Sequence, residues 1–219
     1  METSSAQQGV DLIRQYFSDF TPQQLSQLEK LDGLYKEWNE KINVISRKDI
    51  DALYERHILH SLSIAAVFSF TPGTQIIDIG TGGGFPGIPL AIFFPAVHFH
   101  LTDSIAKKLK VVEAVATTIG LTNVSIQHTR SEEIKNRKFD YAVSRAVAPL
   151  KELWKWSRPL LHSTAAVKEN EHVPGLICLK GGNLVDEIKE SGTRPHQVEI
   201  TSLFPLPFFD EKYLLYVPR

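Results

Sequence analysis

The sequence predicts an α/β fold in which a helical extension precedes a mostly parallel sheet of seven strands, the last one antiparallel. Short apolar runs rich in β-branched residues alternate with helical patterns from Gln75 onward. This alternation is typical of a parallel sheet covered by helices on both faces. A glycine-rich loop follows the first apolar run directly, from Gly80 to Gly84. Loops of this kind bind ligands at the edge of α/β sheets.

Residues 1–70 are expected to form the helical extension, and residues 71–219 the main domain. A helix starts at Pro22, because Thr21 is suited to cap the first turn and proline to occupy its first position. Apolar residues then recur at steps of three and four, which places them on one helix face. A second helix is expected from near Asp49 to about Phe68.

The main domain is expected to alternate strands and helices. Strands are predicted at 75–79, 97–102, 124–128, 139–144, 175–180, 197–203 and 213–217. Helices are predicted at 87–94, 104–119, 149–161 and 183–190. A proline-containing turn at 204–207, and no helix, separates the last two strands, so the final strand is expected to be antiparallel.

The glycine loop is the most informative segment. An apolar strand ends at Gly80, and four of the next seven residues are glycine. Gly80, Gly82 and Gly84 are candidate cofactor contacts, because bare backbone lets a ligand approach closely. The glycines also match the dinucleotide fingerprint, which keeps an NAD-dependent oxidoreductase as an alternative. The glycine directly after the strand is Gly80, which gives the pattern G-x-G-x-G followed by Phe85. This pattern, and the lack of the second, substrate-binding domain that dehydrogenases usually carry, favour a methyl donor such as S-adenosylmethionine over a dinucleotide. A tight turn without a ligand would also use glycine.

Polar residues follow the next three strands. Asp103 lies 23 residues after Gly80 and is placed to accept hydrogen bonds from a ribose, although it would also cap the next helix. Ser131 and Glu132 are placed to meet an adenine ring, and Glu132 alternatively favours a helix start. Arg145 follows the fourth strand among small residues that leave it room to reach into a cleft. We predict that Arg145 is the catalytic residue. The alternative is that it forms a salt bridge that stabilises the sheet edge.

The composition narrows the class of protein. With 24 Lys and Arg against 25 Asp and Glu, a wholly basic surface is excluded, while a local basic patch is not. The single cysteine cannot form an internal disulfide, and neither a secretory signal nor a membrane-length apolar run is present. We therefore expect a cytoplasmic protein without membrane contact. His57 and His60 share a helix face, but no further ligand accompanies them, so no metal site is expected.

The chain resembles the bacterial glucose-inhibited division protein B family over nearly its whole length. The motifs that carry the resemblance are Trp38-Asn39 with Asn43, Arg56-His57-Ile58-Leu59, the run from Asp78 to Ala91, Asp103-Ser104, the run from Arg145 to Leu150, and Leu179-Lys180-Gly181. The Phe85-Pro86-Gly87 continuation and the Arg145 run are the specific ones. One departure is His60-Ser61, where the family commonly has Asp-Ser.

The resemblance implies a Rossmann-like class I methyltransferase. Such a protein would transfer a methyl group from S-adenosylmethionine to N7 of a guanosine in 16S ribosomal RNA of the small subunit. The residues that would line the cofactor site are Gly80, Phe85, Ser131, Glu132 and Arg145. We expect the protein to act as a monomer.

Guanine N7 carries a free lone pair, so it attacks the methyl group without a general base. The protein then accelerates the reaction by holding N7 in line with the methyl group and the sulfur. Arg145 would hold either the base or the methionine carboxylate. N7 faces the deep groove of A-form RNA, so the target is expected in a loop or out of its stack.

The candidate phosphate contacts are Arg56, His57, Lys107, Lys108, Arg130 and Lys180, and the lysine pair would otherwise form a solvated helix face. A non-catalytic RNA-binding or ribosome-assembly module is a further alternative, which the near-neutral charge disfavours.

Overall fold

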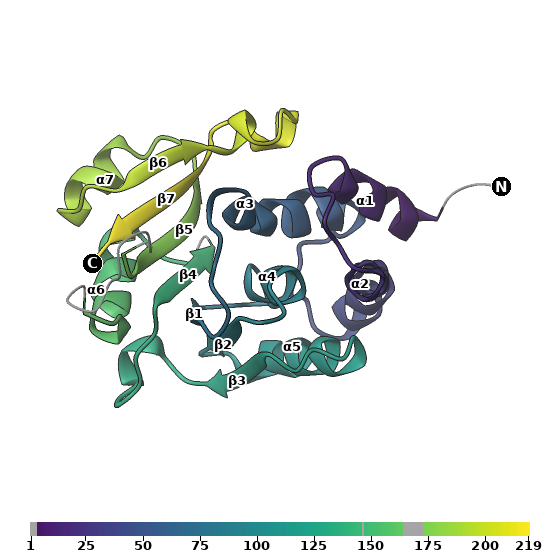
Figure 1. Cartoon of the computed structure of the whole chain (residues 1–219), viewed down its shortest axis with the longest axis horizontal. Helices are drawn as coiled ribbons and strands as arrows, with labels where there is room; N and C mark the ends of the chain where they lie inside the picture. Colours follow the sequence, from purple (N-terminus) through teal and green to yellow (C-terminus); the bar gives the residue numbers. More distant parts are fainter. Residues whose placement is uncertain (1–3, 146, 164–172) are drawn as a thin grey trace.

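The computed structural model describes residues 4–145, 147–163 and 173–219, and its strands form one sheet (Figure 1). The strands are β1 (Gln75–Ile79), β2 (His98–Asp103), β3 (Val124–His128), β4 (Tyr141–Arg145), β5 (Gly175–Gly181), β6 (His196–Glu199) and β7 (Lys212–Pro218). Their order across the sheet is β3-β2-β1-β4-β5-β7-β6. Strands β1 to β5 pair in parallel, whereas β7 is antiparallel to both β5 and β6. The predicted sheet, with its antiparallel last strand, is therefore confirmed.

Helices cover both faces of the sheet, as predicted (Figure 1). They are α1 (Ser5–Arg14), α2 (Pro22–Lys41), α3 (His60–Val67), α4 (Gly87–Phe93), α5 (Ala106–Thr118), α6 (Leu150–Ser157) and α7 (Val185–Ser191). The side chains of β1 alternate between two apolar clusters. Ile76 packs with the helices α1 to α5, and Ile77 packs with α6 and the adjoining α7. This period of two is what a strand buried on both faces requires.

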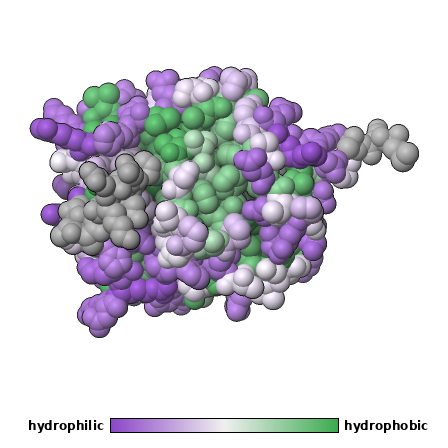
Figure 2. Space-filling model, in the orientation of Figure 1, coloured by the Kyte–Doolittle hydropathy of each residue, from purple (hydrophilic) through white to green (hydrophobic). Residues whose placement is uncertain are grey.

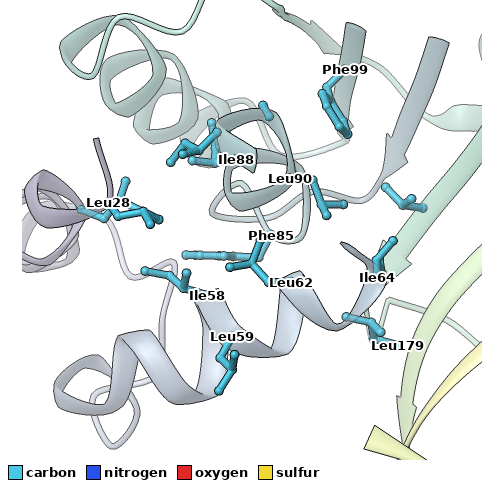
Figure 3. Close-up of a cluster of buried hydrophobic side chains, with 14 of the residues drawn as sticks. Leu28, Ile58, Leu59, Leu62, Ile64, Phe85, Ile88, Leu90, Phe99 and Leu179 are labelled. Atoms are coloured by element: carbon cyan, nitrogen blue, oxygen red, sulfur yellow. The ribbon is translucent and has the colours of Figure 1, made fainter. Parts of the chain in front are cut away.

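The described part of the extension, residues 4–70, forms helices that share one core with the sheet. Figure 3 shows Ile58 and Leu62 lying against Phe85, in the space between the α3 segment and α4. Two buried glutamines fasten α2 to the main domain: Gln24 donates to the carbonyl of Ile92 at 2.7 Å, and Gln27 to that of Ile119 at 2.9 Å. Because the core is continuous here, a boundary at residue 70 stays a prediction.

The extension begins with a helix that the sequence analysis did not separate, α1. Gly9 in its middle lowers the helical signal, yet a Cβ at Gly9 would lie 2.0 Å from the ring of Tyr54. Packing against Tyr54 therefore requires glycine at position 9, despite its low helix propensity. The start of α2 at Pro22 is confirmed, with a capping box between Thr21 and Gln24.

Several predicted boundaries are wrong. The expected helix from Asp49 to Phe68 is a 3₁₀ turn (Ile50–Ala52), a π-helical segment (Tyr54–Leu59) and then α3. The expected helix 149–161 ends at Ser157, because Pro159 has no N–H to continue it and a 3₁₀ turn follows. The expected strand 197–203 ends at Glu199, where buried Ile200 starts another 3₁₀ turn.

Apolar residues gather near the middle of the face drawn in Figure 2. An apolar hollow of about 270 Å³ lies between the end of α3 and strands β6 and β7. Its lining is Val67, Phe68, His196, Val198, Leu214 and Tyr216. None of the predicted site residues lines this hollow.

Candidate functional site

The carboxyl ends of β1, β2 and β3 meet at a cavity of about 100 Å³. The cavity brings together residues from separate parts of the chain. Its lining is Ile79, Gly80, Asp103, Ser104, Thr129, Arg130, Ser131, Glu132, Val147 and Trp156. Gly80, Asp103, Ser131 and Glu132, which the sequence proposed as cofactor contacts, thus share one hollow. Val147 and Trp156 were missed, because nothing in their local sequence signals a ligand.

The three candidate glycines of the loop have different surroundings. All have positive φ, which favours glycine: 67° at Gly80, 59° at Gly82 and 100° at Gly84. A Cβ at Gly84 would lie 2.6 Å from Ile88, and one at Gly80 would lie 2.7 Å from Val147. A Cβ at Gly82 would have nothing within 4 Å. Of the three, Gly82 is therefore the one that faces open space.

Asp103 ties the loop to the end of β2. Its Oδ2 accepts from the backbone N–H of Gly82 at 2.9 Å, and its Oδ1 accepts from that of Ile105 at 2.8 Å. The second bond closes a turn just before α5, whose N-cap is Ile105 and has no side-chain capping bond, so the prediction that Asp103 caps this helix is wrong. Each carboxylate oxygen has a further lone pair, so contact with a ribose stays compatible with this geometry and stays a prediction.

Asp78, to which the sequence analysis gave no role, fixes the loop from inside. It is fully buried, and its Oδ2 accepts from Thr81 Oγ1 at 2.6 Å and from the N–H of Gly87 at 2.9 Å. Its Oδ1 has no hydrogen-bond partner among the described residues. Burial raises the pKa of Asp78 to about 7, against the lowering effect of these bonds and of the Arg145 charge. A carboxylate inside an apolar strand was a signal available in the sequence.

Arg145 lies at the end of β4 and reaches toward the helical extension, not into the cavity. Its Nη2 is 2.9 Å from His57 Nδ1, and its Nη1 donates to the carbonyl of Arg56 at 3.3 Å. Its guanidinium lies 5.0 Å from the centre of the Phe85 ring. Burial lowers the pKa of Arg145 to about 10, so it stays charged at neutral pH. No carboxylate among the described residues forms an ion pair with it.

Aromatic rings connect Arg145 to the glycine loop. The Phe85 ring lies 4.9 Å from that of Tyr35 and 5.2 Å from that of His57, measured between centroids. The Tyr35 hydroxyl donates to the carbonyl of Gly83 at 2.6 Å. Tyr35 and His57 both come from the helical extension, so the extension contributes directly to the surroundings of the loop and of Arg145.

His57 and His60 are neutral and are not held alike. Burial first, and then the charge of Arg145, lower the pKa of His57 to about 3. Burial also holds the pKa of His60 well below its usual value, and its ring packs against Phe208 and Phe209. Within the described ranges, no group of three His, Cys, Asp or Glu side chains is placed to bind a metal ion.

The candidate phosphate contacts differ in availability. Lys107 and Arg130 are exposed, and Lys108 is partly exposed. Arg56 pairs with Asp49 at 2.5 Å. Lys180 is 8% exposed, pairs with Glu187 at 2.6 Å and donates to the carbonyl of Ala148 at 2.5 Å. The structure therefore places Lys180 as a support for the segment after Arg145.

The fold of the chain is shared with a solved protein. A solved S-adenosylmethionine-dependent methyltransferase from Aquifex aeolicus has the same fold, with a TM-score of 0.51 and 15% identity. The match covers 76% of this chain and 92% of that one.

The family follows from the sequence comparison. Residues 24–206 match the GidB family model, described as rRNA small subunit methyltransferase G, and the chain belongs to this family. Proteins named ribosomal RNA small subunit methyltransferase G are similar along almost their full length. The one from Phocaeicola vulgatus is 51% identical, over 95% of this chain and 98% of its own. The one from Cytophaga hutchinsonii is 47% identical, over 95% and 99%. In the described ranges no helix is long and apolar enough to cross a membrane.

Proposed function

We propose that this protein is an rRNA methyltransferase that transfers a methyl group from S-adenosylmethionine to N7 of a guanosine in 16S ribosomal RNA. One observation carries the proposal. The cavity at the carboxyl ends of β1 to β3 joins Gly80 of the glycine loop with Asp103, Ser131 and Glu132, and a positive charge without a carboxylate partner among the described residues, Arg145, lies at the end of the adjacent strand β4. Family membership favours the methyl donor over the dinucleotide alternative.

The residues present fit S-adenosylmethionine. Gly82 leaves open space above the backbone, Asp103 offers acceptors for ribose hydroxyls, and Ser131 with Glu132 offers polar contacts for an adenine. When bound, this cofactor supplies an electrophilic methyl group on a sulfonium. Val147 lies over Gly80, so this side chain is in direct contact with the loop that would hold the cofactor.

Arg145 is proposed to hold an anionic or electron-rich group. A partly buried cation without a carboxylate partner favours an incoming negative charge, and both the methionine carboxylate and an RNA phosphate carry one. The guanine base offers O6 and N7 as acceptors for the same planar donors. No general base is assigned, because N7 needs none, and the residues act by orienting the reactants.

The RNA surface is proposed to include Arg56, His57, Lys107, Lys108, Arg130 and Lys180. Lys107 and Arg130 are the most accessible and are expected to contribute most to phosphate binding, whereas Lys180 would act through the backbone that it supports. We place the protein in the cytoplasm, as a monomer acting on the small subunit or its RNA.

The experiment is methyl transfer from isotopically labelled S-adenosylmethionine to naked 16S RNA and to assembled small subunits, beside calorimetric titration with the cofactor and with NAD. We expect label in one of the two RNA substrates, binding of S-adenosylmethionine and no binding of NAD. Cofactor binding without transfer to either substrate would identify a non-catalytic RNA-binding module instead.

A further inference from the structure

His57, in the helical extension, contacts Arg145 through its side chain. It lies on the π-helical segment Tyr54–Leu59, 88 positions before Arg145 in the sequence. Its Nδ1 is 2.9 Å from Nη2 of Arg145, within hydrogen-bond distance. Arginine has no acceptor atoms, so this contact is a hydrogen bond only when Nδ1 is unprotonated and accepts.

Among the residues that the structure describes, both groups that accept from Arg145 are neutral. One is the His57 imidazole, and the other is the backbone carbonyl of Arg56. A carboxylate in either place would orient the guanidinium equally well, but it would cancel the positive charge. Neutral acceptors fix the orientation of the guanidinium and leave its charge uncompensated. The low pKa of His57 agrees with this arrangement.

A third contact completes the geometry. The Phe85 ring lies 5.0 Å from the guanidinium carbon of Arg145 and 5.2 Å from the His57 ring. Since Phe85 directly follows the glycine loop, its ring packs the arginine and the histidine against the end of that loop. A displacement of His57 would therefore move Arg145 relative to the loop.

We propose that His57 is a positioning residue that orients the guanidinium of Arg145 through a neutral acceptor and so keeps its charge available to the reactants. The inference rests on the proposed role of Arg145. It differs from the phosphate contact that the sequence suggested for His57, because the acting atom faces Arg145.

Three substitutions of His57 test separately the hydrogen-bond acceptor that it offers to Arg145 and the absence of a negative charge beside Arg145. His57→Asn puts a neutral acceptor oxygen near the position of Nδ1, and it is expected to keep methyl transfer within about threefold. His57→Leu removes the acceptor, and it is expected to lower kcat at least about tenfold. His57→Asp keeps an acceptor but adds a negative charge, and it is expected to raise KM at least about tenfold. His98→Leu, at an exposed histidine at the start of β2, is the control and is expected to have no effect.

A double variant tests whether His57 acts through Arg145. If it does, the double variant His57→Leu/Arg145→Lys has a methyl-transfer rate less than twofold below that of Arg145→Lys alone. The two substitutions then remove the same interaction. Fully multiplicative effects would overturn the proposal, as would equal rates for the Asn and Leu variants. If Arg145→Lys alone leaves the rate unchanged, the proposed role of Arg145 fails, and that outcome is distinct from a failure of His57 alone.

Discussion

At the scale of single residues, three glycines with positive φ have three different surroundings. Gly84 faces Ile88 and the hydroxyl of Tyr35, Gly80 faces Val147, and Gly82 faces open space. The sequence pattern treats them alike, because spacing alone does not tell a packed glycine from an accessible one. Only the structure separates the position that bears on folding from the position that bears on a ligand.

Alanine substitutions are expected to separate these roles. Gly82→Ala should weaken S-adenosylmethionine binding at least about tenfold, which is about 1.4 kcal/mol, while the protein stays folded. Gly84→Ala should instead lower the melting temperature, because its methyl group would collide with Ile88. Gly192→Ala is the matched control, since Gly192 has a φ of 66° and open surroundings at the end of α7, outside both the glycine loop and the cavity lining. Equal cofactor affinities for the Gly82 and Gly192 variants would show that Gly82 does not contact the ligand.

The buried carboxyl of Asp78 predicts a pH dependence of stability. Its pKa is about 7 in the folded protein against an ordinary value of 3.8, so the folded state binds the extra proton between these values. The favourable contribution is complete below about pH 4 and is lost as the pH rises to 7. Asp78→Asn keeps an acceptor for Thr81 and removes the titration. Its stability relative to the native protein should rise from pH 4 to pH 7, by at most ~4 kcal/mol. Denaturant unfolding at both pH values checks this, and a constant difference would contradict it.

At the scale of elements, the regular strands and helices were predictable, because their apolar periods of two and 3.6 reflect burial on the sheet. The antiparallel final strand followed from the missing helix before it. The segment from Ile50 to Val67 was not predictable in detail, since the 3₁₀ and π stretches are only three and six residues long, too short for their different periods to show in the apolar spacing. The cavity residues at strand ends were predictable from topology, whereas the orientation of Arg145 toward His57 depends on tertiary packing.

The link from α2 to the glycine loop gives a further prediction. Tyr35→Phe removes the hydroxyl that donates to Gly83 and leaves that carbonyl unpaired, at a cost of about 1–2 kcal/mol. The expected result is weaker cofactor binding as well as reduced stability. Tyr54→Phe is the matched control, because its buried hydroxyl donates to the carbonyl of Leu28, away from the loop. We expect the control to lose stability only. If both variants bind the cofactor alike in calorimetry, the Tyr35 contact does not shape the site.

At the scale of the whole molecule, the helical extension and the sheet share one core, and the extension contacts both Arg145 and the glycine loop. Val10 and Leu28 of the extension belong to the same apolar cluster as Phe99 and Leu214 of the sheet. The sequence divides these parts at residue 70, but apolar contacts cross that division. The extension is thus expected to support both the loop, through Tyr35, and Arg145, through His57.

This shared core predicts a single cooperative unfolding transition for the whole chain. Scanning calorimetry should give a calorimetric enthalpy equal to the van't Hoff enthalpy. A core substitution in the extension, Leu28→Ala, should lower the one transition temperature as a whole, with a loss of about 2–5 kcal/mol. Two resolved transitions, of which only one responds to Leu28→Ala, would mean that residues 1–70 fold separately.

The central claim is methylation of guanine N7 in 16S ribosomal RNA, with Arg145 as the residue that aligns the reactants. The most direct measurement maps N7-methylguanosine in 16S RNA from cells that carry the native gene, the Arg145→Lys variant or a deletion. We predict one N7-methylated guanosine that is present with the native protein, absent in the deletion and reduced with the variant. The methyl-transfer rate of the Arg145→Lys variant in vitro should fall at least about tenfold, which corresponds to about 1.4 kcal/mol. An identical set of methylated nucleotides in all three strains would contradict the account.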